Sequence, residues 1–135
     1  MTHADIDSQL LVTIDNNVGT LAELTNVIAS SGINLIAMCA YAVDNKGVIM
    51  FVSDNNKQAQ KLLKAKKYEV REEEVVLISV DNKPGALQSV TGKISMAGID
   101  LTLLYGSVDK AGKTSRVVLV SEDNKAVLTA IKMVA

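Results

Sequence analysis

The sequence holds few of the residues from which metal sites and many enzyme sites are built. Of its 135 residues one is cysteine and one is histidine, and tryptophan is absent. A single cysteine excludes an internal disulfide and any metal site with several thiolate ligands. The one histidine, His3, lies near an N-terminus that we expect to be frayed, which disfavours histidine-based catalysis and zinc chemistry. The remaining possibilities are ligand binding and catalysis by carboxylate side chains.

The chain also lacks an excess of positive charge and a long apolar run. Its 14 Lys and Arg residues against 15 Asp and Glu leave a formal net charge of -1, and aromatic residues make up 3%. Binding to a nucleic acid or an anionic membrane needs basic residues, and base stacking needs aromatic ones. No apolar run reaches the roughly 20 residues that cross a bilayer, and residues 2–7 do not resemble a signal peptide. We therefore expect a cytoplasmic protein with neither a nucleic acid nor a membrane as partner.

What the sequence does have is enough apolar material to fold. Hydrophobic residues make up 48% and the mean hydropathy is +0.22, above the values of disordered chains. Cys39 lies in an apolar run and is expected to be a small core residue, as are Met38, Met50 and Met96. No known catalytic motif occurs, and we expect no catalytic residue, no metal ligand and no cofactor.

An internal repeat divides the chain. The segment Asp15–Leu21 recurs as Asp81–Leu87, an offset of 66 residues. At the same offset Ser31–Leu35 recurs as Ala97–Leu101. Two motifs in one register indicate two copies of the same structural unit.

Each copy predicts the same order of elements. The β-branched runs Leu10–Ile14 and Val75–Val80 are typical of buried strands. Gly32 and Gly98 fit left-handed positions at the ends of the helices that follow. These helices carry apolar stripes at spacing i, i+3 and i+7, made by Leu21, Leu24 and Ile28 in the first copy and by Leu87, Val90 and Ile94 in the second.

A β-hairpin and a second helix come next in both copies. The hairpins join Ile33–Val43 to Val48–Ser53 and Ile99–Val108 to Arg116–Ser121, with polar turns at 44–47 and 109–112. The second helices have apolar stripes made by Ala59, Leu62 and Leu63 and by Val127, Ala130 and Ile131. On the first of them, five lysines predict a solvated face rather than a phosphate site: Lys57, Lys61, Lys64, Lys66 and Lys67.

A last strand, Tyr68–Glu74, closes the first copy as β-α-β-β-α-β, the ferredoxin-like arrangement of an antiparallel sheet with helices on one face. The second copy lacks this strand. We therefore predict an α+β protein with two domains, residues 8–74 and 75–135, in which the strand that begins at Val75 has an unpaired edge. Because no Gly, Pro or Asn separates Tyr68 from Val80, little linker lies between the domains. Units of about 65 residues are marginal alone, so we expect a homodimer or another homo-oligomer.

The repeated pattern is similar to the ACT domain, a small regulatory module that binds amino acids. The pattern is a strand, Asp-Asn-x-Pro-Gly-x-Leu, an amphipathic helix, Gly-Ile-Asn/Asp-Leu and another strand. Both copies match over nearly the whole chain, although the first has Val18 at the proline position and the second has Asp100 at a position that is often asparagine. The resemblance implies a tandem ACT protein that is not an enzyme, binds a free amino acid, and acts on a metabolic enzyme or regulator.

The loops between strand and helix are the predicted ligand sites. Backbone N–H groups at a helix N-terminus favour a carboxylate, and glycine lets a ligand approach the backbone. Pro84 suits a helix start. Asn34 and Asp100 match the family's ligand-contacting asparagine and would accept hydrogen bonds from an α-ammonium group. The loop candidates are Asn16, Asn17, Val18 and Gly19 in the first copy and Asn82, Lys83, Pro84 and Gly85 in the second. The resemblance implies that the ligand lies where one module's loop meets its partner.

Three other interpretations remain open. The loops are also ordinary turn chemistry, and Asn34 and Asp100 also suit local backbone hydrogen bonds. In a second interpretation the loops bind nothing and the open sheet edge binds a protein partner by strand addition. In a third the chain is catalytic, and Glu72–Glu74 is then the only acid cluster that offers a proton-transfer group, although a charged strand edge explains it more simply.

Overall fold

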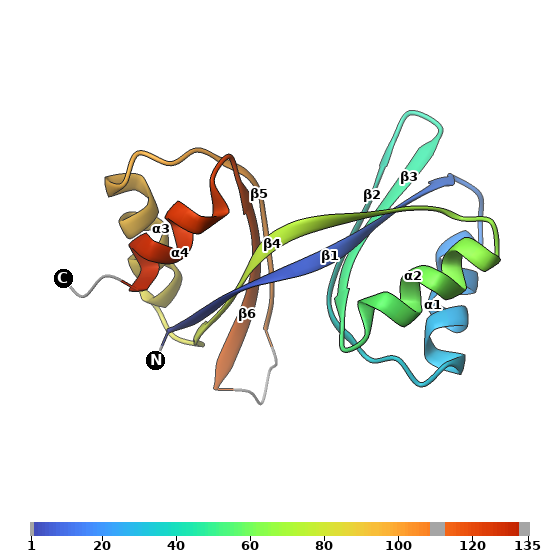
Figure 1. Ribbon diagram of the computed structural model, residues 1–135, viewed down its shortest axis with the longest axis horizontal. Helices are drawn as coiled ribbons and strands as arrows, with labels where there is room; N and C mark the ends of the chain where they lie inside the picture. The colour runs from blue at the N-terminus through green and yellow to red at the C-terminus, as the bar shows by residue number, and fades with distance from the viewer. Residues whose placement is uncertain (1, 109–112, 133–135) are drawn as a thin grey trace. The chain divides into compact units, whose positions relative to one another are not determined.

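The computed structural model describes residues 2–108 and 113–132, and it shows an α+β fold (Figure 1). The predicted turn at 109–112 lies outside the described residues. In chain order the elements are β1 (His3–Asp15), α1 (Thr20–Ser30), β2 (Leu35–Val43), β3 (Lys46–Ser53), α2 (Asn56–Ala65), β4 (Glu69–Asp81), α3 (Ala86–Met96), β5 (Leu101–Val108), β6 (Thr114–Ser121) and α4 (Asn124–Lys132). In this order the predicted repeat of strand, helix, hairpin and helix is confirmed.

Two compact units make up the chain. The first unit is Ser8–Glu73, and the second unit combines Met1–Asp7 with Glu74–Ala135. The division at 73/74 lies one residue from the predicted one, and residues 1–7, which the prediction assigned to neither domain, belong to the second unit. Strands β1 and β4 have 13 residues each, and each contributes to both units. Strand β4 runs without a break from Glu69 to Asp81 across the division between the units, where little linker was predicted.

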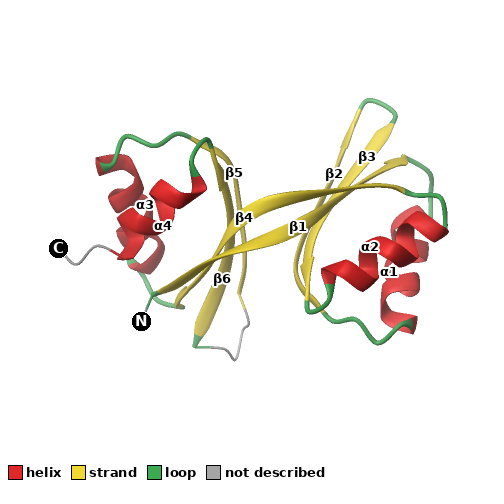
Figure 2. Cartoon of the chain, in the orientation of Figure 1, coloured by secondary structure: helices red, strands yellow, loops and turns green. Residues whose placement is uncertain are grey.

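In the first unit the strand order is β2-β3-β1-β4, with antiparallel pairs β1–β3 and β2–β3. Helices α1 and α2 cover one face of these strands (Figure 2). The apolar stripe of α1 faces the strands because Leu24 and Ile28 fall on one side of the helix. The core beneath the helices consists of Leu10, Val12, Leu24, Ile28, Ile33, Ile49, Phe51, Ala59 and Leu63.

The second unit repeats this arrangement. Its strand order is β1-β4-β6-β5, in which β1 is represented by residues 3–7, and α3 and α4 cover one face (Figure 2). Strand β6 pairs antiparallel with β4 and with β5. The core consists of Ala4, Val76, Ile78, Val80, Val90, Ile94, Val117, Leu119, Val127 and Ile131.

The start of the chain supplies the outer strand of the second unit. Ala4 is 3% exposed and lies in the same core cluster as Val76 and Ile78. The strand that begins near Val75 therefore lies inside the sheet, between β6 and residues 3–7 of β1, and the predicted unpaired edge there is wrong. The expectation of a frayed N-terminus is also wrong for residues 3–7, because they lie in β1. The sequence did not indicate this strand because only Ala4 among these residues is buried, and one buried residue gives no recognisable alternation.

Three apolar residues that were predicted to lie in the core are exposed in the structure. Leu21 and Leu87, which begin the stripes of α1 and α3, are 42% and 41% exposed. Met96 is 90% exposed because it ends α3 two residues after Ile94, off the stripe that Val90 and Ile94 form. Within the described part of the chain no helix is long and apolar enough to cross a membrane.

The predicted glycines end α1 and α3. Gly32 and Gly98 have φ values of 76° and 72°. After α1, the N–H groups of Gly32 and Ile33 donate to the carbonyls of Ala29 and Ile28 at 3.0 and 3.4 Å, and α3 ends in the same way. This is the Schellman motif, which satisfies the last carbonyls of a helix and turns the chain into the next strand.

Candidate functional site

The loops that enter α1 and α3 have the same turn geometry. In the first, the N–H of Thr20 donates to the carbonyl of Asn17 at 3.3 Å, and Gly19 has φ 88° and ψ -9°. In the second, Ala86 donates to Lys83 at 3.2 Å, and Gly85 has φ 87° and ψ -14°. These values match the third residue of a type II turn, which requires positive φ and therefore favours glycine.

The same geometry explains the proline position. Pro84 precedes Gly85 and so occupies the second residue of the turn, where proline is favoured. It lies before the N-cap of α3, rather than in the first turn of the helix as its suitability for a helix start had suggested. In the first unit Val18 takes this place with its side chain fully exposed.

Each loop is also held by the neighbouring hairpin. The N–H of Asn16 donates to the carbonyl of Asn45 at 3.0 Å, and the N–H of Asn82 donates to Lys113 at 2.8 Å. Asn16 and Asn82 therefore fix the loops through their backbones.

The helices differ in how their N-termini are capped. Gly19 and Gly85 cap α1 and α3 and provide no side-chain hydrogen bond. In contrast, the side chain of Asn55 accepts from the N–H of Gln58 at α2, and Asp123 accepts from Ala126 at α4, both at 3.1 Å. A helix N-terminus without a side-chain cap presents N–H groups to solvent or to a ligand, and its dipole favours an anion.

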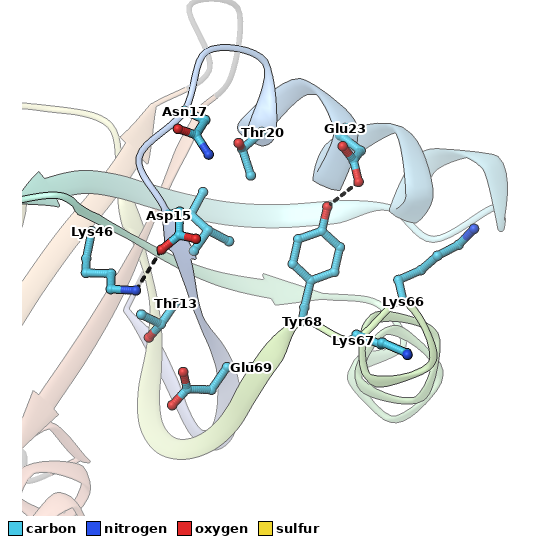
Figure 3. A pocket seen from close by; sticks show the side chains of 11 residues that line it. Thr13, Asp15, Asn17, Thr20, Glu23, Lys46, Lys66, Lys67, Tyr68 and Glu69 are labelled. Carbon is cyan, nitrogen blue, oxygen red and sulfur yellow. Dashed lines mark hydrogen bonds and ion pairs between the residues drawn. The ribbon is translucent and has the colours of Figure 1, made fainter.

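A cleft of about 410 Å³ opens beside the N-terminus of α1 in the first unit (Figure 3). We call it the first cleft. Its walls are mostly polar and come from the end of β1, the start of α1, Lys46 of β3 and the segment that follows α2. The lining residues are Thr13, Ile14, Asp15, Asn17, Thr20, Glu23, Lys46, Lys66, Lys67, Tyr68 and Glu69. Of the predicted site residues only Asn17 is among them.

Two polar pairs shape the first cleft. Lys46 Nζ lies 2.7 Å from Asp15 Oδ1, and this hydrogen bond, aided by the opposite charges, lowers the pKa of Asp15 and raises that of Lys46. Both side chains are well exposed. The Tyr68 hydroxyl donates to Glu23 at 2.8 Å, as Figure 3 shows, and burial, followed by this bond, raises the pKa of Tyr68.

Lys66 and Lys67 reach the first cleft because α2 ends early. The helix stops at Ala65, and Lys67 has φ 69°, the left-handed conformation that Gly32 and Gly98 adopt at the equivalent place after α1 and α3. Lys66 and Lys67 are exposed, as the prediction of a solvated face required, but they follow α2 and do not lie on it. The sequence carries no signal for this turn, because a left-handed residue after a helix is usually glycine and lysine rarely takes that place.

Asn34 and Asp100 lie at the other end of their units. Leu35 pairs with Ser53, whereas Asp15 pairs with Lys46, so Asn34 and the loop at Asn16 lie at opposite ends of β3. Eight strand residues correspond to about 25 Å. The backbone of Asn34 exchanges hydrogen bonds with Asp54, and that of Asp100 with Glu122. Within one unit the structure therefore does not bring Asn34 or Asp100 to its loop.

The second unit has a cavity of its own at the loop that enters α3. It measures about 300 Å³, and we call it the second cavity. It is lined by Val80, Asp81, Asn82, Lys83, Leu87, Gly106, Ser107, Ser115, Arg116 and Val117. Two of the predicted site residues, Asn82 and Lys83, are therefore on its wall.

Two of the glutamates of β4, Glu73 and Glu74, have hydrogen-bond partners in the fold. Gln9 Nε2, fully buried, donates to Glu73 Oε1 at 2.8 Å. The Asn124 amide donates to the carbonyl of Glu74 at 3.1 Å. Across the described residues no group of three or more His, Cys, Asp or Glu side chains is placed to hold a metal ion.

The fold and the repeated loops define a tandem pair of ferredoxin-like modules. The family model of an ACT domain pair matches residues 6–132, and the chain therefore belongs to the ACT domain family, as the repeated motif predicted. No curated protein sequence matches the chain.

Solved structures share this fold. A protein from Bacteroides thetaiotaomicron is 29% identical, with a TM-score of 0.87 over 96% of this chain and 88% of that one. The ligand-free regulatory subunit of aspartate kinase from Thermus thermophilus is 14% identical, with a TM-score of 0.70 and coverages of 95% and 93%. The corresponding subunit from Thermus flavus is 14% identical, with a TM-score of 0.62 and coverages of 96% and 94%.

Proposed function

We propose that the chain is a regulatory protein that senses a free amino acid, and that the first cleft is one of its binding sites. The observation that carries this proposal is the N-terminus of α1, which has no side-chain cap and adjoins a polar cleft of about 410 Å³. This volume is within the range of small-molecule sites. Membership in the ACT family and the shared fold with aspartate kinase regulatory subunits support an amino-acid-sensing role.

The charges of the first cleft suit a zwitterion. The start of α1 favours the α-carboxylate, and the ammonium groups of Lys66 and Lys67 add positive charge. Glu69 lines the opposite wall and supplies a carboxylate for the α-ammonium group (Figure 3). Because most of the remaining wall is polar, we expect a ligand with a polar or charged side chain.

Ligand binding would regulate by shifting a conformational or assembly equilibrium. A ligand changes such an equilibrium only by the difference in its affinity for the two states. We propose a homodimer or another homo-oligomer as the assembly, a metabolic enzyme or regulator as the protein partner, and the cytoplasm as the location. The predicted contacts of Asn34 and Asp100 with a ligand remain part of the proposal only for a site that another chain completes.

A thermal-shift screen against the twenty amino acids at millimolar concentration tests the proposal. A ligand at about 100 times its Kd stabilises the folded state by about 2.7 kcal/mol. Thr20→Glu places a carboxylate in the first turn of α1, where it favours the helix and repels the ligand carboxylate. We expect it to weaken binding by more than about tenfold, measured by titration calorimetry.

Gln58→Glu is the matched control. It makes the same charge change in the first turn of α2, a helix of the same unit whose first turn does not line the cleft. We expect it to leave the affinity within about twofold, a change of only about 0.4 kcal/mol. Absence of a shift for every amino acid would contradict the proposal and favour a ligand-free interaction module.

A further inference from the structure

The lysines of the first unit are gathered on one helix and the turn that follows it. The unit contains as many Lys and Arg residues as Asp and Glu residues. Residues 57–67 nevertheless contain five lysines and no Asp or Glu. Lys66 and Lys67 line the first cleft, whereas Lys57, Lys61 and Lys64 do not. We call these last three residues the lysine face.

The lysine face lies on the outer side of α2. Lys57, Lys61 and Lys64 are exposed, and their spacing of i, i+4 and i+7 places them on one side of the helix. Ala59 and Leu63 are fully buried and lie on the opposite side. At the rise of an α-helix, the three lysines extend over about 10 Å.

The fold provides no opposite charge for the lysine face. In the part of the chain that the structure describes, none of its three side chains makes an ion pair or a hydrogen bond, whereas Lys46 pairs with Asp15. Helix α1 covers the same side of the strands and has one charged residue, Glu23 (Figure 2). The Glu23 carboxylate accepts the hydrogen bond from Tyr68 and is therefore already engaged.

The lysine face destabilises α2 in the free chain. Like charges three and four residues apart on a helix repel one another. Lys57 also lies in the first turn, which holds no acidic residue and where the helix dipole disfavours a cation. The helix forms because Asn55 caps it and because Ala59 and Leu63 pack in the core. Folding therefore does not account for the lysine face, whereas an anionic partner would.

The equivalent helix of the second unit lacks the middle charge. Helix α4 has Lys125 and Lys132 at the two outer positions, but Thr129 at the position of Lys61. Its two lysines are seven residues apart, and neither has another lysine three or four residues away. The lysine face is therefore a feature of the first unit and not of the fold that both units share.

The rest of the chain favours a protein as the anionic partner. The first unit has no excess of basic residues, and aromatic residues make up 3% of the chain, so neither backbone neutralisation nor base stacking supports a nucleic acid. The apolar side of α2 packs in the unit's own core and is not available for insertion into a membrane. Carboxylates along one segment of a protein would match the lysine face in charge and length.

We propose that the lysine face binds an acidic segment of the regulated protein, whose carboxylates extend over about 10 Å. Charge complementarity of this kind speeds association, selects the partner and weakens as salt is added. The inference rests on the proposed regulatory function, and it names the surface that binds the protein partner and the charge of that partner.

Fluorescence anisotropy of a labelled poly-L-glutamate peptide, titrated with the full chain, tests the inference. Lys61→Glu reverses the middle charge and places a carboxylate between Lys57 and Lys64, which favours the helix. We expect it to weaken peptide binding by more than about tenfold and to raise the thermal midpoint by about 1–4 °C. Lys125→Glu makes the same charge change at an exposed position of α4, and it should change peptide affinity by less than about twofold.

Lys61→Arg keeps the positive charge and should retain peptide affinity within about twofold. Equal weakening by Lys61→Glu and Lys125→Glu would overturn the inference, because net charge alone would then explain binding. Tighter binding to oligothymidylate, or to vesicles of phosphatidylserine and phosphatidylcholine in equal parts, would also overturn it. A chain that shows an amino-acid thermal shift but does not bind the peptide would overturn it and leave the proposed function standing.

Discussion

The two units share a backbone and differ in the side chains around it. Both enter their first helix through a type II turn with glycine at φ near 88°, and both leave it through a Schellman motif. Around these turns the first cleft is lined by three lysines and three carboxylates, whereas the wall surface of the second cavity is mostly apolar and its charged lining residues are Asp81, Lys83 and Arg116. The turn geometry is therefore common to both units, and the segments that lie beside the turn make the difference between the first cleft and the second cavity.

The cross-strand pairs beside the turns differ between the units. At the last ladder position, Asp15 faces Lys46 in the first unit, whereas Asp81 faces the uncharged Thr114 in the second. One position earlier, Ile14 faces Gly47 in the first unit and Val80 faces Ser115 in the second. The same fold and turn geometry thus carry side chains of different charge and size in the two units.

The largest changes in the free energy of unfolding are expected from substitutions in the two hydrophobic cores. Phe51 and Leu119 occupy equivalent positions and are both fully buried. Phe51→Ala should lower the free energy of unfolding by about 3–5 kcal/mol, and Leu119→Ala by about 2–5 kcal/mol. Because β1 and β4 contribute to both units, each variant should shift one common transition in chemical denaturation. Two separate transitions would show that the units unfold independently.

The glycines of the two turns should be equally sensitive. A Cβ on Gly19 or Gly85 meets no atom within 4 Å, so alanine there costs only the strain of positive φ. We expect Gly19→Ala and Gly85→Ala each to destabilise by about 1–2 kcal/mol in urea denaturation. A much larger loss in one unit would mean that the two turns are not equivalent.

The proline position offers a smaller, reciprocal test. Val18→Pro introduces the residue that Pro84 already provides in the second turn, and it restricts the unfolded chain. It should raise the free energy of unfolding by about 0.4–1 kcal/mol, and Pro84→Val should lower it by a similar amount. A loss of stability in Val18→Pro, measured by thermal unfolding, would contradict a shared turn geometry.

The smallest expected effect is the dependence of stability on pH that arises from the pair Asp15 and Lys46. The hydrogen bond from Lys46 lowers the pKa of Asp15 below 3.8, so its stabilising contribution is present above that value and is lost as the pH falls through the folded pKa. The raised pKa of Lys46 gives a contribution that is present below 10.5 and is lost at higher pH. Lys46→Thr, which copies the second unit, should move the Asp15 pKa upward in a carboxyl NMR titration. If the Asp15 pKa is the same in this variant, the Lys46 side chain is not the cause of its lowering.

The sequence predicted the local structure well because the repeat appeared twice. The stripes that include Leu24 and Ile28, the helix-ending glycines and the family all followed from short-range patterns. Residues 3–7 were missed because only Ala4 alternates into the core, and no local pattern indicates which distant unit a strand joins.

The predicted site was less complete for a related reason. The loop residues could be located, but Asn34 was grouped with them although an entire helix and strand length separates the two. Lys67, Tyr68 and Glu69 were missed as cleft residues because they come from the far end of the unit. Which segments lie beside a loop depends on strand register, and the sequence pattern does not specify that register.

Because β1 contributes to both units, the two units should fold at different times while the chain is synthesised. The first unit is continuous, so all of its residues exist once Glu73 has been synthesised. The second unit needs residues 3–7, which are made before the first unit, together with helix α4, which is made after it. The contacts between these segments span more than a hundred residues, and contacts between residues so distant in sequence form slowly. We expect the first unit to fold early during synthesis and the second to fold only after α4 has been made.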